Sequence, residues 1–207
     1  MSQYKKYFTR AVLAHYPDRA ARLVEEIEEH FAIIHPDIAF ARSSANPIDR
    51  RLEMCAYFLA FIKTLDEDGR SFQEIREISL EVVTAYVQPR NGIHLWLKRL
   101  PVLILPTWMG RIMVRWMKKN FSRNAHPDGF VAEIITDPKE TYGFGYGFDI
   151  VECGICKLFK KHDYARYASI LCEVDEVTSA LAGLKLIRTG TIANGAYKCD
   201  FRFEKLK

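Results

Sequence analysis

The chain has 207 residues, 49% of them hydrophobic and 13% aromatic, which permits a sizeable core and argues against intrinsic disorder. Its net charge of +4 is too small by itself to indicate a nucleic-acid partner, which needs a clustered basic face. The first residues do not form the pattern of a signal peptide, because charge, His and Pro interrupt their apolar run. An odd number of cysteines, mostly late in the chain, argues against a disulfide framework, so a cytoplasmic protein is expected.

The first part of the chain, up to residue 126, has helical periodicity. Asn46 is an expected N-cap, followed by Pro47 at the first helical position. Ser71 and Glu74 have the spacing of a capping box. A linker is expected over residues 37–46. The predicted helical segments are 3–16, 18–34, 47 to about 69, 72–88 and a broken stretch over 93–121.

The most apolar run, residues 95–117, contains four basic residues and two prolines, so no transmembrane segment is predicted there. A buried or interfacial helix is expected instead. Core packing is expected for an apolar stripe at helical spacing, rather than a lipid or cofactor groove: Trp108, Met109, Ile112, Met113 and Trp116. A solvated polar face is expected for the neighbouring basic residues, with binding to an anionic surface as the alternative: Arg111, Arg115, Lys118 and Lys119.

Beyond residue 126 the pattern changes to strands and helices in the order ββααββ. This order predicts an α+β fold with an antiparallel sheet. Residues 1–126 would form a helical region and 127–207 an α+β region, together one integrated domain. The expected strands are 130–136, 142–150, 184–192 and 196–204, and the expected helices are 152–162 and 164–179.

A glycine-punctuated segment, residues 143–147, superficially resembles a phosphate-binding loop. It lacks the Lys-Ser/Thr pair of such loops, and no helix follows at once. A strand is therefore expected, in which small residues allow another backbone or a ligand to approach.

Four of the five cysteines fall between residues 151 and 203, namely Cys153, Cys156, Cys172 and Cys199. The first two have the C-x2-C spacing of a structural zinc site, but the last two do not form a second such pair. No metal and no cofactor are therefore predicted. Burial in the core is the ordinary alternative for each of these cysteines.

Two of these cysteines have positions suited to nucleophilic chemistry. Cys153 lies near the expected start of a helix, where backbone N–H groups favour a thiolate. Cys172 and Asp175 are three residues apart and would share a helix face, as a nucleophile and a general base. Cys199 alternates with Phe201 and Phe203 on one face of the last strand, so it should point inward.

Taken together, these motifs resemble the L-2-amino-thiazoline-4-carboxylic acid hydrolase family. The similarity covers about fifty residues and includes a cysteine at a helix start, a C-x-x-D, an Arg-Thr strand end and a terminal G-x-x-x-C-D-F-x-F. In this sequence they are Cys153, Cys172 to Asp175, Arg188-Thr189 and Gly195 to Phe203.

The resemblance implies hydrolytic opening of a small cyclic amidine to an N-carbamoyl amino acid. It implies Asp175 as the base, Cys172 or Cys153 as the nucleophile or a pocket wall, and Arg188 as the cation for the substrate carboxylate. Cys199 and Asp200 would complete the substrate site, with Asp200 orienting a partner.

Two other functions are compatible with the same residues. The terminal strand is also similar to vinyl-reductase-type domains, which implies a non-catalytic module that binds a small ligand. A zinc-stabilised interaction domain is the third hypothesis. A small molecule is the expected partner in the first two cases, and a homodimer is possible.

Overall fold

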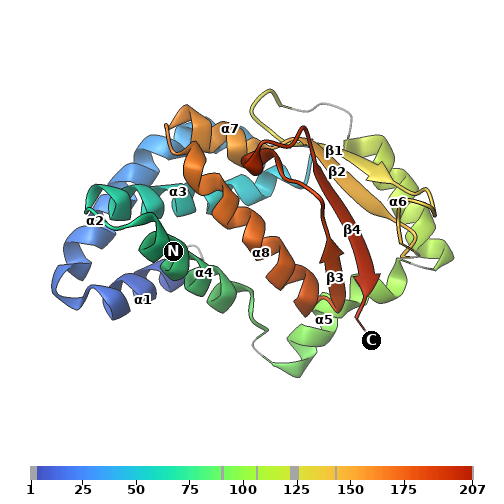
Figure 1. The fold of residues 1–207 in the computed structure, drawn as a ribbon, viewed down its shortest axis with the longest axis horizontal. Helices are drawn as coiled ribbons and strands as arrows, with labels where there is room; N and C mark the ends of the chain where they lie inside the picture. The colour runs from blue at the N-terminus through green and yellow to red at the C-terminus, as the bar shows by residue number, and fades with distance from the viewer. Residues whose placement is uncertain (1–3, 90, 106, 122–125, 143, 207) are drawn as a thin grey trace.

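The computed structural model describes residues 4–89, 91–105, 107–121, 126–142 and 144–206. Helices α1 to α4 gather at one side of the molecule and the sheet lies at the other, with α7 and α8 between them (Figure 1). Among the described residues, no helix has the length and apolar content needed to cross a membrane.

Helices α1, α2 and α4 of the first region follow the predicted boundaries to within two residues. Their apolar faces are buried at the positions that the 3.6-residue period indicates, such as Leu23 and Ile27. The Ser71 hydroxyl accepts the Glu74 N–H at 3.2 Å, as the capping box predicts, while the Glu74 carboxylate accepts the Tyr16 hydroxyl at 2.7 Å. The helices are α1 (Lys5–His15), α2 (Ala20–Ile34), α3 (Leu52–Glu67) and α4 (Phe72–Val87).

The segment between α2 and α3 differs from the prediction. The expected linker is largely a 3-10 helix, His35–Arg42, and α3 begins only at Leu52, after a second short 3-10 turn, Asp49–Arg51. Asn46 does cap a turn, since its Oδ1 accepts the Ile48 N–H at 3.1 Å. Its Nδ2 donates to the Phe130 carbonyl at 2.9 Å, so this side chain connects the turn to the segment that enters the sheet.

The broken helical stretch consists of α5 (Gly92–Ile104) and α6 (Trp108–Phe121). The prediction of core packing for its aromatic and methionine stripe is wrong. Trp108 is 74% exposed and Trp116 is 65% exposed, and Met109 and Ile112 are also exposed. The reason is that α6 buries a different side, centred on Val114, against β1.

The second region is a four-stranded antiparallel sheet in the order β1-β2-β4-β3, with two helices in its middle connection. The α+β prediction and the ββααββ order are thereby confirmed. Figure 1 shows α8 running beside β3 and α6 at the opposite edge, beside β1. The elements are β1 (Val131–Ile135), β2 (Gly147–Glu152), α7 (Gly154–Lys161), α8 (Ala168–Leu181), β3 (Leu184–Ile187) and β4 (Cys199–Lys205).

The glycine-rich segment before β2 is only partly a strand. Tyr142 and Gly145 have φ values of 47° and 94°, so the chain turns here and β2 begins only at Gly147. A Cβ atom at Gly147 would lie 2.6 Å from the Phe201 carbonyl oxygen, which confirms the close backbone approach expected in this strand. Gly143 lies outside the described residues.

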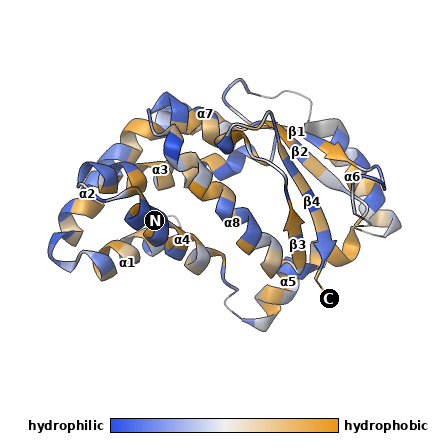
Figure 2. Ribbon diagram, viewed as in Figure 1, coloured by the Kyte–Doolittle hydropathy of each residue, from blue (hydrophilic) through white to orange (hydrophobic). Residues whose placement is uncertain are grey.

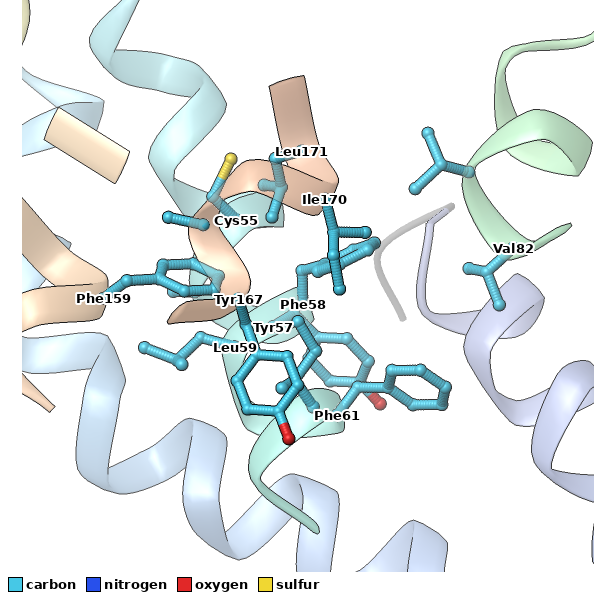
Figure 3. Packing of buried hydrophobic residues seen from close by; sticks show 14 of the residues in the cluster. Cys55, Tyr57, Phe58, Leu59, Phe61, Val82, Phe159, Tyr167, Ile170 and Leu171 are labelled. Carbon is cyan, nitrogen blue, oxygen red and sulfur yellow. The ribbon is translucent and has the colours of Figure 1, made fainter. Parts of the chain in front are cut away.

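One hydrophobic core joins the two regions. Figure 3 shows Phe58 and Phe61 of α3 packed with Phe159 of α7 and with Tyr167, which precedes α8. All four side chains are fully buried. In Figure 2 this apolar character continues from α3 into the strands. The domain boundary at residue 126 remains a prediction, but the core crosses it.

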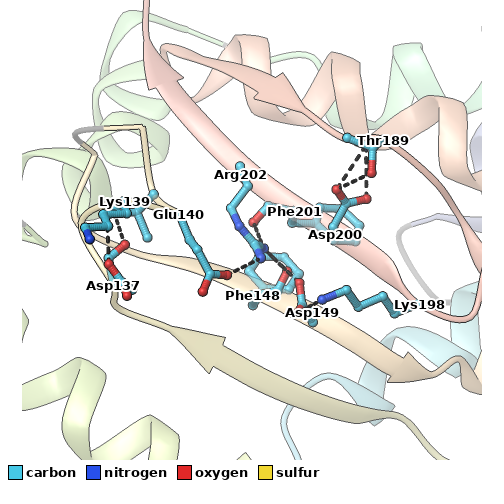
Figure 4. A network of polar contacts seen from close by, with 11 residues as sticks. Asp137, Lys139, Glu140, Phe148, Asp149, Thr189, Lys198, Asp200, Phe201 and Arg202 are labelled. Atoms are coloured by element: carbon cyan, nitrogen blue, oxygen red, sulfur yellow. Dashed lines mark hydrogen bonds and ion pairs between the residues drawn. The ribbon is translucent and has the colours of Figure 1, made fainter.

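The two faces of β4 differ in chemistry. Cys199, Phe201 and Phe203 are buried on the inner face, as the alternation predicts. On the outer face, Arg202 is also buried and its guanidinium lies 2.8 Å from the Asp149 carboxylate, which also binds Lys198 at 2.6 Å (Figure 4). The negative charge of Asp149 compensates the positive charges of Arg202 and Lys198. The outer face of β4 is therefore covered by paired polar groups and not by apolar side chains.

Candidate functional site

A cavity of about 520 Å³ lies between the inner face of the sheet and the helices α6, α7 and α8. Its walls are mostly apolar, with Phe130, Phe148 and Phe201 among them. The polar groups in its walls include one carboxylate, one guanidinium and four cysteines: Asp175, Arg51, Cys153, Cys156, Cys172 and Cys199. Residues distant in the sequence therefore meet at one cavity, as expected for a small-molecule pocket.

Cys153 occupies the N-cap position of α7, with an extended backbone (φ −106°, ψ 110°). Interaction with the Cys156 thiol lowers the pKa of Cys153, and the N–H groups of Cys156 and Ile155 lower it further. Burial and, to a smaller extent, the negative charge of Asp175 oppose this effect. The pKa of Cys156 is correspondingly raised. Cys153 is therefore the cavity cysteine that most readily forms a thiolate.

Cys172 and Asp175 both line the cavity from α8, which confirms that they share a helix face. Burial raises the pKa of Cys172 to about 12, and the negative charge of Asp175 adds to this rise. Burial and the negative charge of Asp175 therefore disfavour a Cys172 thiolate. The pairing of a Cys172 nucleophile with Asp175 as its base stays a prediction that these pKa directions do not favour.

Burial also raises the pKa of Asp175, and only the Arg188 guanidinium, with a smaller contribution from Arg51, opposes the rise. A carboxyl group in this condition exchanges protons closer to neutral pH than an exposed aspartate does. Cys199 also has a raised pKa because of burial, and its sulfur accepts the Ile192 N–H at 3.2 Å. Cys199 therefore lines the cavity as a neutral thiol and not as a thiolate.

Arg188 lies behind the cavity rather than in its wall. Its guanidinium donates to the Asp175 carboxylate and to the Cys172 carbonyl, both at 2.9 Å, and it lies 5.1 Å from the centroid of the Phe201 ring. Its side chain is 10% exposed and contributes to a separate shallow recess of about 420 Å³ beside Thr189 and Gly190. In this arrangement Arg188 holds Asp175 in place.

Asp200 fixes the loop that follows β3. Its carboxylate accepts hydrogen bonds from the Thr189 N–H, the Thr189 hydroxyl and the Gly190 N–H at 2.7–3.1 Å (Figure 4). Although burial opposes it, these hydrogen bonds hold the pKa of Asp200 below its ordinary value. Asp200 is not in the lining of the cavity among the described residues, and the loop that it binds is next to Arg188 in the chain.

Arg51 was not identified from the sequence. It ends the short turn before α3 and lines the cavity, although its side chain is exposed to solvent. Its charge lowers the pKa of Asp175, which places the two groups within electrostatic reach. Its position about 120 residues before Asp175 in the chain gave no local signal of this proximity.

All five cysteines are free. Within the ranges that the structure describes, no group of three or more His, Cys, Asp or Glu side chains is arranged to hold a metal ion. The four cavity cysteines come from three different elements and do not form a cluster with that geometry.

The fold and cavity define an α+β protein with a cysteine-lined pocket between an antiparallel sheet and its helices. Residues 104–203 match the model of the L-2-amino-thiazoline-4-carboxylic acid hydrolase family, which confirms the resemblance seen in the C-terminal motifs. The matched region contains Cys153, Cys172, Asp175 and Cys199, whereas Arg51 comes from outside it. No curated protein and no solved structure matches the chain.

Proposed function

We propose that the protein is a hydrolase that opens a small cyclic amidine of the thiazoline-carboxylate type to give an N-carbamoyl amino acid. The observation that carries this proposal is the pairing, in one cavity, of a thiol with a lowered pKa and a buried carboxyl with a raised pKa. Groups with pKa values displaced toward each other suit nucleophilic and acid–base roles in one reaction.

In the first step, the Cys153 thiolate attacks the ring carbon between nitrogen and sulfur. A bond forms between that carbon and Sγ, the ring C–S bond breaks, and the leaving sulfur takes a proton from the Asp175 carboxyl group. The product is an open isothiourea attached to Cys153. The mostly apolar walls lower the local polarity, which strengthens the electrostatic interactions at the reacting carbon.

In the second step, water attacks the same carbon. Asp175, now ionised, takes a proton from the water, the bond to Sγ breaks, and the Cys153 thiolate is restored. The sum of the two steps is the addition of one water molecule, which yields the carbamoyl product and a free thiol. The N–H groups at the start of α7 stabilise the thiolate whenever it is present.

Arg188 and Arg51 have different roles in this proposal. Arg188 is already bound to Asp175 and to the Cys172 carbonyl, so it positions the acid–base group, and Asp200 supports it through the Thr189 loop. Arg51 lines the cavity and is the cation proposed to bind the substrate carboxylate. Cys172 and Cys199 complete the wall around the ring.

The test is to incubate the protein with 2-amino-thiazoline-4-carboxylate and follow the free thiol released. Cys153→Ser and Asp175→Asn should each lower kcat by at least about 100-fold, in line with the usual contribution of such groups. Cys55→Ala is the control, because Cys55 is buried in the core and is not among the described lining residues. Full activity in both site variants would refute these assignments.

The proposed binding of the substrate carboxylate by Arg51 is tested separately. Arg51→Ala should raise KM for the carboxylate substrate and leave KM for 2-aminothiazoline, which lacks the carboxylate, nearly unchanged. Arg188→Ala should lower kcat for both compounds, since it acts through Asp175. If instead Arg188→Ala raised KM for the carboxylate substrate alone and Arg51→Ala did not, Arg188 would be the residue that binds the substrate carboxylate.

The thiolate can be tested without a substrate. Alkylation of Cys153 by iodoacetamide should reach half its maximal rate at a pH below the ordinary thiol range, while Cys172 stays unreactive until near pH 12. Peptide mass spectrometry separates the two sites. Equal pH profiles would contradict the proposed nucleophile.

A second function is favoured by one observation, the predominantly apolar wall of the cavity. A module that binds a small apolar ligand without converting it would need such a wall and no nucleophile. Native mass spectrometry of the purified protein would then show a bound small molecule, with no turnover of cyclic amidines. Turnover would exclude this alternative.

A further inference from the structure

Helices α5 and α6 expose an unusual amount of apolar surface. The chain contains three tryptophans, and all of them lie here with 55–74% of their surface exposed. Ordinary monomers rarely expose so many large apolar side chains together, because each one left in water forgoes the free energy of burial. Among the described residues, the exposed large apolar side chains of this pair are Ile93, Trp96, Leu97, Leu103, Trp108, Met109, Ile112, Met113 and Trp116.

The segment that contains α5 and α6 is basic and has no acidic residues to balance its charge. Residues 82–127 contain eight lysines and arginines and no aspartate or glutamate, although the whole chain has 26 acidic residues. The rest of the chain is therefore net acidic. In α5 and α6 the exposed basic side chains are Arg99, Arg111, Arg115 and Lys118.

On α6 the two kinds of side chain occupy adjacent strips. Trp108, Ile112 and Trp116 recur every four residues and so follow one face, and Arg111 and Arg115 follow the neighbouring face. Val114 marks the buried side, against β1. The first turn of α6 lies against the end of α5, since a Cβ atom on Gly110 would lie 2.4 Å from the Ile104 carbonyl oxygen.

We propose that the α5–α6 pair binds the surface of an anionic phospholipid bilayer. Tryptophan has an apolar ring and a polar N–H and is favoured at the boundary between lipid tails and headgroups. Arginine and lysine beside it pair with lipid phosphates. The two helices have 13 and 14 residues, which is too short to cross a bilayer, so the contact is with its surface.

Charge distinguishes a bilayer from a second copy of the chain. A symmetric dimer through this surface would place the basic strip of one copy against or near that of the other, with no acidic residue in the segment to compensate. An anionic bilayer supplies the missing negative charge along the whole strip.

The opposite side of α6 gives this contact a consequence inside the molecule. Met113, Val114 and Met117 line the cavity, so one helix separates the cavity from the bound surface. A ligand with an apolar part would therefore have a short path from the bilayer to the cavity. The membrane contact stands on the α5–α6 surface alone and does not depend on the proposed hydrolase activity.

The test is sedimentation of the full-length protein with vesicles of phosphatidylcholine alone or with 30% phosphatidylglycerol. We expect binding to the anionic vesicles, with a blue shift in tryptophan fluorescence, and little binding to the neutral ones. Raising salt should weaken binding. The double variant R111E/R115E should lower the affinity at least about tenfold, because each basic residue near an anionic surface contributes about 1 kcal/mol.

The double variant K160E/K185E is the matched control, since it makes the same change in net charge at exposed sites outside α5 and α6. For the apolar part, Trp116→Ser should weaken binding, and Ile33→Ser, at a 68% exposed position on α2, should not. Equal binding to neutral and anionic vesicles, or equal losses in variant and control, would overturn the proposal. So would light scattering that shows a dimer dissociated by Trp116→Ser, with no vesicle binding.

Discussion

Helices α3 and α6 are both rich in large apolar residues, but they have opposite positions in the structure. Eleven residues of α3 are buried, including Tyr57, Phe58 and Phe61. On α6, Val114 is buried while Trp108 and Trp116 remain largely exposed. The difference lies in their neighbours: α3 is covered by α2, α4 and α7, whereas α6 packs on β1 at the edge of the sheet. Apolar periodicity therefore predicts that a helix has an apolar face, but it does not predict which part of the protein packs against that face or whether the face stays exposed.

The largest contrast should come from removing one ring from each helix. Phe58→Ala leaves a cavity in the core and should lower the free energy of unfolding by about 3–5 kcal/mol. Trp116→Ala removes a ring that is 65% exposed, and its effect should stay within about 0.5 kcal/mol. Urea denaturation of both variants measures the two values. A loss above about 2 kcal/mol for Trp116→Ala would show that α6 packs more tightly than its exposure indicates.

A second test concerns the polar connection that anchors the start of α3 to the sheet. The fully buried Asp49 accepts the Phe130 N–H at 2.9 Å and the Ser44 hydroxyl at 2.5 Å. Asp49→Ala leaves the buried N–H without a partner and should cost about 2 kcal/mol. Asp49→Asn keeps an acceptor and should cost less. Denaturation curves that rank the two variants in the reverse order would contradict this assignment.

A smaller effect is expected at the N-terminus of α4, which covers α3. Ser71→Ala removes the side-chain acceptor for the Glu74 N–H and should destabilise the protein by about 1 kcal/mol. Ser71→Asp retains the cap and should be nearly neutral. Thermal unfolding followed by circular dichroism measures both, and equal losses would mean that the cap contributes nothing specific.

The smallest effect should come from the ion pair between Arg76 of α4 and Glu173 of α8. Both side chains are about one-third exposed, so the pair should contribute no more than about 1 kcal/mol. Arg76→Ala should show this loss at low salt and less of it at 0.5 M salt, because exposed charges are screened. A loss that is independent of salt would point to packing of the arginine stem instead.

The folding pattern of the second region was predictable because it depends on local periodicity. The ββααββ order, the inward direction of Cys199 and the shared face of Cys172 and Asp175 all follow from periods of two and 3.6 residues. The strand expected from Tyr142 begins only at Gly147, since Tyr142 and Gly145 adopt positive φ values and the chain turns there. The late start of α3 has a similar cause, because Asn46 is engaged with Phe130 of the distant sheet.

The site was predictable only in part. The sequence placed Cys153 at a helix start, and the structure adds the Cys156 thiol that helps to lower its pKa. The sequence also selected Arg188 as a free cation for a substrate, but the fold pairs it with Asp175. Arg51 was missed because nothing in its local sequence indicates that it shares a cavity with Asp175 of α8, which lies more than a hundred residues later.

The sequence by itself determined the α+β class, the family resemblance and the residues available for chemistry, because these depend on spacing along the chain. Only the tertiary structure decided which of those residues meet in one cavity and which face solvent. Long-range packing brings Arg51, Cys153 and Asp175 to one wall and leaves the tryptophans of α5 and α6 outside. The physical reason is that burial, and the pKa shifts that follow from it, depend on neighbours that the local pattern does not specify.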